Sequence, residues 1–297
     1  MERENRMTVL EVLQSSTEYF KKRKIESARL NAEHLLAHTL GIKRLELYLQ
    51  FERVLAEGEL VPLRDLVKRR GEGEPLQHLL GTVEFCGHTF VIDKRAMIPR
   101  PETEQLVELI FQSTINKSPS GSERPSGSDQ PSTILDVGTG SGVIALSLAS
   151  KFPNAIIVAT DISDDALALA QENAARLGLS TRVQFRKNNL LENFTERFDL
   201  IVANLPYISM QDRHLLSREV LHDPEVSLFA GERGDELIRE LIEKAPPRLH
   251  PGGLLALELA MDQSVPIVDF LESKKYKDTE VKNDYSDRPR FVFARYG

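Results

Sequence analysis

Cysteine is nearly absent from this sequence of 297 residues, which contains only Cys86. An internal disulfide needs two cysteines and a cysteine-based metal cluster needs several, so both are excluded. The sequence also lacks an uninterrupted apolar stretch of the roughly 18 residues that a membrane span requires. Its first residues, MERENRMTVL, lack the apolar core of a signal peptide. These absences predict a cytoplasmic protein in a reducing environment, with no membrane partner.

An excess of basic residues is missing as well. Lys and Arg total 38 against 45 Asp and Glu, which gives a formal net charge of -7. A protein held mainly to a phosphate backbone usually carries a basic face, so direct nucleic-acid binding is not expected. The hydrophobic fraction of 41% and the charged fraction of 28% are those of a globular protein. The length is sufficient for two domains.

Helical periodicity dominates the first 70 residues. Apolar residues recur on one face of each of several segments, and Gly41 provides a stop signal after the second. Such stripes are typical of the core of a small helical bundle. We therefore predict a helical domain at residues 1–72, which we expect to recognise the substrate. The segments are 8–22, 27–40, 43–51 and 59–70.

The period changes in the segment 81–93, GTVEFCGHTFVID, where apolar residues alternate on both sides of Cys86-Gly87-His88. This pattern predicts a β-hairpin, and we assign residues 73–95 to a hairpin linker. Residues 113–132 are rich in Ser, Pro and Gly, which predicts a flexible insertion without an assigned function.

Strands and helices alternate in the remainder, so residues 96–297 are expected to form an α/β domain. Alternation of this kind predicts a doubly wound, Rossmann-like sheet with helices on both faces, here followed by a terminal antiparallel hairpin. The expected strands are 133–137, 155–160, 182–186, 198–203 and 253–259, the helices 142–151, 164–177 and 237–248, and the hairpin strands 280–283 and 290–295.

A glycine-rich loop, DVGTGSG, follows the first expected strand of this sheet. Glycine permits a positive φ and lets a ligand approach the backbone. The dinucleotide fingerprint would need glycine where Val143 stands, and the spacing suits S-adenosylmethionine better. The expected cofactor-binding residues of the loop are Asp136, Gly138, Thr139, Gly140, Ser141 and Gly142, with Asp136 serving the cationic amino group directly or through water.

Polar residues also end the next two strands. Asp161 lies about 20 residues beyond the loop, where an acid can accept both ribose hydroxyls of a nucleoside. A helix cap is the alternative for Asp161, and Ser163 competes for that role. One of Asn188 and Asn189 could hydrogen-bond an adenine edge, while a simple turn explains this pair equally well; Asn189 is included among the cofactor-binding candidates.

The fourth strand ends in Asn204-Leu205-Pro206-Tyr207, the expected catalytic residues. Asn204 is also included among the expected cofactor-binding residues. A planar amide or arylamine nitrogen is a poor nucleophile because its lone pair is delocalised. The Asn204 side-chain oxygen and the Leu205 carbonyl can grip the two NH2 hydrogens and aim the lone pair at a methyl donor. Pro206 adds no competing donor, and Tyr207 offers a flat face. Catalysis would be positioning, without a metal. Glutamine and adenine both qualify as substrates.

Several segments outside the strand ends resemble one family. Residues 73–92, 96–110 (AMIPRPETEQLVELI), 222–237 and 287–295 are similar to the release factor glutamine methyltransferases of the HemK or PrmC type. The resemblance covers nearly the whole chain. It implies a small helical domain, a hairpin linker and a class-one methyltransferase domain, in the order derived above.

The resemblance also implies an activity. The enzyme would transfer a methyl group from S-adenosylmethionine to the side-chain amide nitrogen of the glutamine in the Gly-Gly-Gln loop of peptide chain release factors. Gly138 to Gly142 and Asp161 would bind the cofactor, and Asn204 to Tyr207 the glutamine. Arg100 and Glu102 would lie near the cofactor.

Leu205 departs from the family, which usually has proline there. Asn-Leu-Pro-Tyr is the form found in ribosomal RNA adenine dimethyltransferases, so adenine-N6 methylation of RNA is the alternative. Those enzymes lack the helical domain and the Ile-Pro-Arg-Pro-Glu-Thr segment and are generally basic. Asn189 also departs, because the family often has aspartate near that position.

Overall fold

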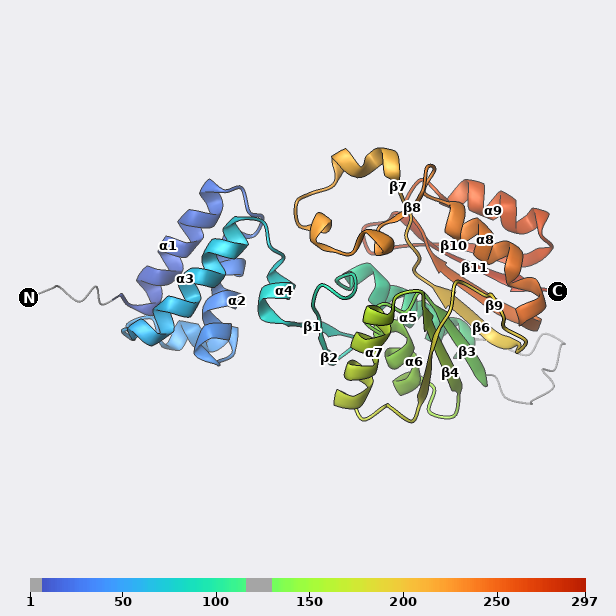
Figure 1. Cartoon of the computed structure of the whole chain (residues 1–297), viewed down its shortest axis with the longest axis horizontal. Helices are drawn as coiled ribbons and strands as arrows, with labels where there is room; N and C mark the ends of the chain where they lie inside the picture. The colour runs from blue at the N-terminus through green and yellow to red at the C-terminus, as the bar shows by residue number, and fades with distance from the viewer. Residues whose placement is uncertain (1–6, 116–129) are drawn as a thin grey trace, which may run out of the picture. The chain divides into compact units, whose positions relative to one another are not determined.

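The computed structural model describes residues 7–115 and 130–297, and the chain divides into two compact units (Figure 1). The helical unit contains the chain up to Thr82 together with Ser217–His222. The sheet unit contains Val83–Leu216 and Asp223–Gly297. The boundary between the units falls inside the segment 73–95 that the sequence suggests as a linker.

The helical unit is a bundle with its own buried apolar cluster. Its first helix begins with a capping box, in which the Thr8 side chain accepts from the Glu11 backbone N–H and the Glu11 carboxylate accepts from the Thr8 N–H. The second helix ends at Gly41, whose φ of 65° is left-handed, as the sequence predicts. Within the expected helical segment 43–51, only Arg44–Leu49 are helical, and they form a 3₁₀ helix rather than an α-helix. The elements are α1 (Val9–Lys22), α2 (Ala28–Leu40), η1 (Arg44–Leu49), α3 (Glu57–Gly71) and α4 (Leu76–Leu80).

The expected hairpin is present as β1 (Thr82–Phe85) and β2 (His88–Val91). Its two turn residues, Cys86 and Gly87, both have positive φ, 48° and 77°. Two-residue hairpin turns of this kind match the right-handed twist of the strands.

The sheet unit is built on seven strands in the order β10-β11-β9-β6-β3-β4-β5. The strands from β9 to β5 pair in parallel, and β10, β11 and β9 pair antiparallel. This confirms the doubly wound sheet and the terminal hairpin. The strands are β3 (Thr133–Val137), β4 (Ile156–Asp161), β5 (Val183–Lys187), β6 (Phe198–Ala203), β9 (Leu249–Glu258), β10 (Tyr276–Asn283) and β11 (Pro289–Tyr296).

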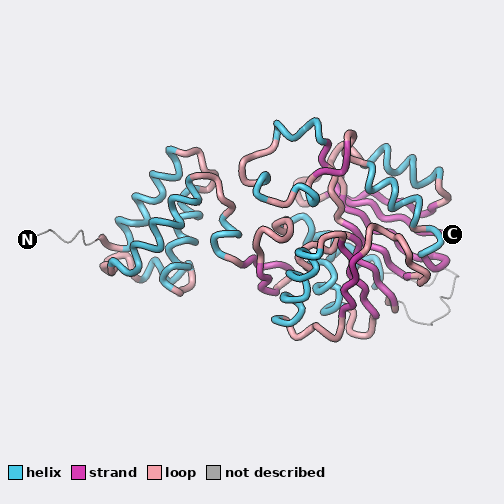
Figure 2. Tube along the Cα trace, viewed as in Figure 1, coloured by secondary structure: helices cyan, strands magenta, loops and turns pink. Residues whose placement is uncertain are grey.

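Helices cover both faces of the sheet, and Figure 2 traces the strands between them. Successive residues of β6 alternate between the two apolar clusters, with Leu200 and Val202 in one and Ile201 and Ala203 in the other. A strand buried on both faces therefore reads as one continuous apolar run. One cluster includes α5 (Pro101–Ile115), α6 (Val143–Lys151) and α7 (Asp164–Arg176), and the other α8 (Glu236–Lys244) and α9 (Ser264–Ser273).

One sequence expectation needs correction, and one segment contains elements that were not predicted. The flexible insertion was expected to begin at residue 113, but α5 continues to Ile115, and residues 116–129 lie outside the described part of the chain. No helix or strand was predicted between β6 and α8. This segment contains a short parallel pair, β7 (Ile208–Ser209) and β8 (Phe229–Gly231), with the 3₁₀ turns η2 (Met210–Leu215), η3 (Val220–His222) and η4 (Glu225–Ser227) between them; η5 (Pro246–Arg248) follows α8.

Candidate active site

The candidate site lies where the strand order reverses. From β3 the sheet continues to β4 and β5 on one side and to β6 and β9 on the other. Loops diverge at such a point, and ligands of open α/β sheets bind beyond the carboxyl ends of the strands there. A cavity of 280 Å³ occupies this position. Its lining includes Gly138 to Ser141, Asp161, Asn188, Asn189 and Asn204 to Pro206, which come from four successive parallel strands.

The three glycines of the loop after β3 all have positive φ, but their surroundings differ. A Cβ on Gly138 would lie 2.9 Å from Leu205 Cδ2, and one on Gly142 would lie 3.0 Å from the Ala170 Cβ. A Cβ on Gly140 would meet nothing described closer than the Ala96 Cβ at 3.9 Å. Gly138 and Gly142 thus permit close packing, whereas Gly140 leaves open space beside the cavity.

Asp136 lies behind the glycine loop and is fully buried. Its Oδ2 accepts hydrogen bonds from the Thr139 hydroxyl at 2.6 Å and the Ala145 N–H at 3.1 Å, so it holds the loop against the first turn of α6. Its Oδ1 is buried without a hydrogen-bond partner among the described residues. Burial raises the pKa of Asp136 to about 7. Asp136 is not part of the described cavity lining, and a contact with a cationic amino group stays a prediction.

Asp161 ends β4 and lines the cavity. Its Oδ2 accepts from the Gly140 N–H and its Oδ1 from the Ser163 N–H, both at 2.9 Å. Burial raises the pKa of this carboxyl group. The cap of α7 is Ser163, whose hydroxyl accepts from the Ala166 N–H at 3.2 Å. Asp161 is therefore not required as the cap, and it joins the glycine loop to the second strand.

Asn188 and Asn189 both line the cavity, and both side-chain NH2 groups bind locally. The Asn188 amide donates to the Leu190 carbonyl at 3.0 Å, and the Asn189 amide donates to the Glu192 carboxylate at 2.9 Å. Each leaves its side-chain oxygen for other partners. The choice of an adenine contact between the two stays open.

Asn204 follows β6 directly and has one satisfied and one unsatisfied end. Its Nδ2 donates to the Thr103 hydroxyl at 3.1 Å. Its Oδ1 is buried and accepts no hydrogen bond from any described residue. A buried acceptor without a donor destabilises a fold by about 1–3 kcal/mol, so such an atom suits a site that a ligand completes.

The backbone after Pro206 is held from two sides. The Gln263 side-chain amide donates to the carbonyls of Tyr207 at 3.1 Å and Gly234 at 2.9 Å. A Cβ on Gly234 would lie 2.7 Å from the Tyr207 carbonyl oxygen, so only glycine allows this approach. Burial raises the pKa of Tyr207, with a further contribution from Glu258. Tyr207 packs against the apolar cluster of α8 and α9, outside the described cavity lining.

The segment that leads into α5, together with the first turn of α5, contributes to the site differently from what the sequence suggests. Arg100 donates to the buried carboxylate of Asp223 at 2.6 Å. The described cavity lining from this segment does not include Arg100 or Glu102, so their place near a cofactor stays a prediction. The contributing residues are Arg95, Ala96, Met97, Pro99 and Thr103.

Three residues at the site escaped the sequence reasoning: Thr103, Gln263 and Glu258. Glu258 ends the apolar run LLALE on β9, and an acid in that position is a signal comparable to Asp161 on β4. Among the described residues, no group of three or more His, Cys, Asp or Glu side chains is arranged to hold a metal ion. No helix in the ranges 7–115 and 130–297 has the length and apolar character that crossing a membrane requires.

The fold and the site together define a class-one methyltransferase domain. The seven-stranded sheet with its terminal hairpin, the glycine loop after the first strand and the acid after the second are the features of that class. A family model described as "Methyltransferase small domain" matches residues 126–231, and one described as "PrmC N-terminal domain" matches residues 11–81.

Relatives that align with nearly the full length of this chain identify its family. A release factor glutamine methyltransferase of Rhodopirellula baltica is 40% identical over 290 residues, which are 96% of this chain and 95% of that protein. The enzyme of the same name from Geobacter sulfurreducens is 37% identical over 98% of this chain and 97% of its own length. The chain belongs to the release factor glutamine methyltransferase family.

A solved structure supports the fold alone. The hMettl16 catalytic domain in complex with MAT2A 3'UTR hairpin 1 is 17% identical, with a TM-score of 0.54 over 82% of this chain and 83% of that one. Likeness at this identity says nothing of the substrate.

Proposed function

We propose that this enzyme transfers a methyl group from S-adenosylmethionine to the side-chain amide nitrogen of the glutamine in the Gly-Gly-Gln loop of peptide chain release factors. The observation that carries the proposal is the buried, unpaired Oδ1 of Asn204 beside the cavity, in a chain of this family. An acceptor in that position is suited to an NH2 group that arrives with the substrate.

The residues around the cavity suit S-adenosylmethionine. Asp161 is partly buried at the end of β4, where its carboxylate can accept the ribose hydroxyls. Gly140 leaves room for a ligand against the backbone. When bound, this cofactor supplies an electrophilic methyl group on a positively charged sulfur. Asp136 and Asp161 favour a cation nearby whenever they are ionised.

The chain's own residues then act by positioning. Asn204 Oδ1 and the Leu205 carbonyl each accept one hydrogen of the glutamine NH2 group, which fixes the plane of the amide and directs its nitrogen. Pro206 has no N–H that could compete for these acceptors. Gln263 holds the backbone at Tyr207, so the two acceptors keep their separation. Such pre-orientation is the main source of rate in a reaction that needs no metal.

The direct test offers one labelled cofactor pool to two substrates. Purified release factor and ribosomal RNA are incubated separately and together with the enzyme and labelled S-adenosylmethionine. We expect label in the protein and none in the RNA. Label in the RNA alone would replace this proposal with the adenine-N6 alternative that the sequence Asn-Leu-Pro-Tyr allows.

Replacing Asp161 should weaken cofactor binding. Asp161→Ala removes an acceptor for the ribose hydroxyls and the anchor of the Gly140 N–H. A hydrogen bond to a charged group contributes about 1.5 kcal/mol, so the dissociation constant should rise about tenfold or more. Isothermal calorimetry measures it. Asp164→Ala is the matched control, because Asp164 is an exposed acid on α7 that pairs with Lys187. Equal affinities of the two variants would contradict the role of Asp161.

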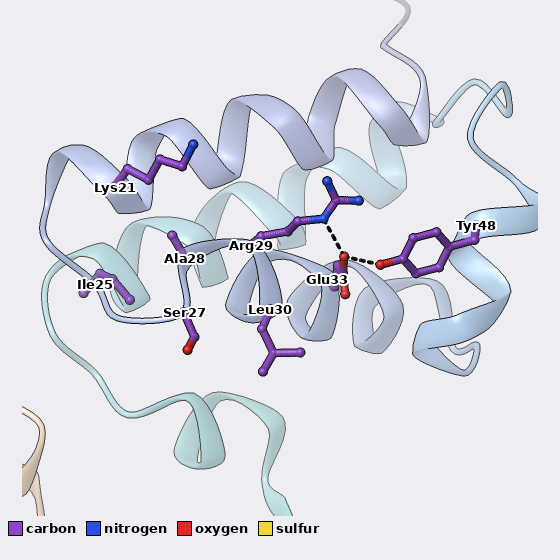
Figure 3. Close-up of a pocket in the computed structure, with 8 residues that line it drawn as sticks. All are labelled: Lys21, Ile25, Ser27, Ala28, Arg29, Leu30, Glu33 and Tyr48. Carbon is purple, nitrogen blue, oxygen red and sulfur yellow. Dashed lines mark hydrogen bonds and ion pairs between the residues drawn. The ribbon is translucent and has the colours of Figure 1, made fainter.

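We further propose that residues 1–72 recognise the release factor. The η1 turn exposes two large apolar side chains, Leu45 at 69% and Leu49 at 86%. Tyr48 between them is held by the buried Glu33, to which its hydroxyl donates at 2.7 Å. Arg29 and Arg44 donate to the same carboxylate at 2.9 Å and 2.7 Å. Figure 3 shows Glu33 reaching Tyr48 and Arg29 in the hollow that these residues line. Exposed apolar side chains beside an anchored tyrosine are suited to contact with a protein partner.

Leu49→Asp tests this recognition role. Losing the burial of one leucine side chain weakens binding by about 1.5 kcal/mol, so KM for intact release factor should rise roughly tenfold. We expect kcat and cofactor affinity to stay at wild-type values. Val265→Asp is the control, because Val265 is 70% exposed on α9 of the sheet unit. A KM that is unchanged in Leu49→Asp, or raised equally in Val265→Asp, would contradict the assignment.

A further inference from the structure

A buried carboxylate lies next to the substrate-holding amide without any role in the mechanism so far. Glu258 is the last residue of β9 and only 2% exposed. Its Oε2 accepts a hydrogen bond from the Thr103 hydroxyl at 2.9 Å. The Thr103 oxygen in turn accepts from Asn204 Nδ2 at 3.1 Å. Strand β9, helix α5 and the residue that directly follows β6 thus contribute one side chain each to a continuous chain of hydrogen bonds.

The direction of these bonds follows from the charge on Glu258. An ionised carboxylate carries no proton and can only accept. Thr103 has one hydroxyl proton, and it must be given to Glu258. The Thr103 oxygen is then left as an acceptor, and the NH2 end of Asn204, rather than its oxygen, satisfies it. The amide therefore points its Oδ1 the other way, where it has no described partner.

We propose that Glu258 and Thr103 are positioning residues, which use the fixed direction of this hydrogen-bond chain to hold Asn204 with Oδ1 presented to the substrate NH2 group. The inference rests on the proposed function and adds the residues that set the orientation of its acceptor. The amide of asparagine is nearly symmetric in shape, so packing alone distinguishes its oxygen from its nitrogen poorly. The hydrogen-bond chain from Glu258 through Thr103 determines which end of the Asn204 amide is the oxygen.

Protonation of Glu258 removes that distinction. A neutral carboxylic acid can donate to Thr103, which frees the Thr103 proton for Asn204 Oδ1 and permits the flipped amide. The flipped amide presents two N–H donors to a substrate NH2 group and cannot hold it. Asn204 should therefore be productive only while Glu258 is ionised.

The surroundings of Glu258 bring its protonation close to neutral pH. Burial raises the pKa of Glu258 to about 7, although the hydrogen bond from Thr103 and the positive charge of Arg290 both lower it. Glu102 raises the same pKa, and the Asn204 amide lowers it. The Tyr207 hydroxyl also interacts with Glu258, and it is neutral in this range because its own pKa is raised from 10.0.

Two substitutions of Thr103 distinguish the effect of its hydroxyl group from the effect of its packing. Thr103→Val keeps the shape and removes the hydroxyl, so kcat on release factor should fall on the order of 10²-fold. Thr103→Ser keeps the hydroxyl and should retain kcat within about threefold, since the chain of bonds survives. Cofactor affinity is measured alongside, because Thr103 also lines the cavity. Thr103→Val turning over at the wild-type rate, or Thr103→Ser losing as much as Thr103→Val, would overturn the proposal.

The pH profile tests Glu258. In the wild type, kcat at saturating cofactor should fall as the pH drops through about 7. In Glu258→Gln the inflection assigned to Glu258 should disappear, with a lower plateau because glutamine can both donate and accept. Burial also raises the pKa of Asp136 to about 7. Asp136 is present in both enzymes, so any inflection that it causes is the same in the wild type and in Glu258→Gln. An inflection that persists unchanged in Glu258→Gln would refute the role of Glu258.

A measurement without substrate separates this proposal from the proposed function. The side-chain NH2 signals of Asn204 can be followed by NMR in asparagine-labelled enzyme and assigned by their loss in Asn204→Ala. We expect them to titrate with a midpoint near the Glu258 pKa of about 7 in the wild type and to lose that midpoint in Glu258→Gln. Signals that do not titrate in the wild type would overturn the proposal, whether or not the enzyme methylates release factor. A normal titration in an enzyme inactive on release factor would support the hydrogen-bond chain and refute the proposed function alone.

Discussion

The Asn204→Ala variant should lose most methyl transfer to release factor, with kcat reduced on the order of 10²–10³-fold. The substitution removes the buried Oδ1 that has no partner in the described structure and that we assign to the substrate NH2 group. The bonds to this atom matter most when the nitrogen turns toward the methyl group, so the loss should appear in kcat more than in KM. Single-turnover methylation at saturating cofactor measures it.

Leu205→Met is the matched control for Asn204→Ala. The Leu205 side chain is buried and lies against Gly138, while its assigned role belongs to the backbone carbonyl. A volume-conserving change preserves the packing and the carbonyl, so it should keep kcat within a few-fold. A folded Asn204→Ala enzyme with near-normal turnover, or a Leu205→Met enzyme as impaired as Asn204→Ala, would defeat the two-acceptor mechanism.

The second large effect is expected at the glycine loop. Gly140→Ala should weaken S-adenosylmethionine binding by about 3 kcal/mol, or roughly a hundredfold. Its Cβ meets nothing described within 3.4 Å, so the protein itself has room for it, but it would fill the space beside the cavity that the ligand needs. Calorimetric titration with the cofactor measures the change.

Gly87→Ala provides the control for backbone strain. Gly87 also has a positive φ, 77°, and open space around its Cβ position, but it lies in the β1–β2 turn. Both variants place alanine in a left-handed conformation, at about 1–2 kcal/mol of strain. They should show similar losses of thermal stability, while only Gly140→Ala loses the cofactor. Similar cofactor affinities in the two would show that Gly140 serves the turn and not the ligand.

The fold was predictable where the pattern is long. The strand β6 was predicted with the bounds that the structure has. Its residues 200–203 are all apolar, as expected for a parallel strand that is buried on both faces. The elements β7 and β8 span two and three residues, too few for any periodicity. The helix α9 was not predicted from the sequence, and it contains Pro266. Pro266 lies in the first turn of α9, where proline is compatible with a helix.

The candidate site was predictable in part for a similar reason. Asp161 and Asn204 directly follow or end parallel strands, so the alternation of strands and helices predicts that they gather at one edge. The partners of Asn204 carry no local signal. Thr103 lies 101 positions from Asn204 and 155 from Glu258 in the sequence, and only the folded sheet brings the three together. The segment around Thr103 also has the sequence of an ordinary helix start, and in the structure it is the first turn of α5.

The account depends on the claim that the end of β6 holds a glutamine side-chain amide. The most direct measurement is mass spectrometry of intact release factor after incubation with enzyme and labelled S-adenosylmethionine, in parallel with a release factor whose Gly-Gly-Gln glutamine is replaced by glutamate. We predict one methyl group on the glutamine of the unaltered factor and none on the altered one. A methyl group at another residue, or equal labelling of both factors, would contradict the account.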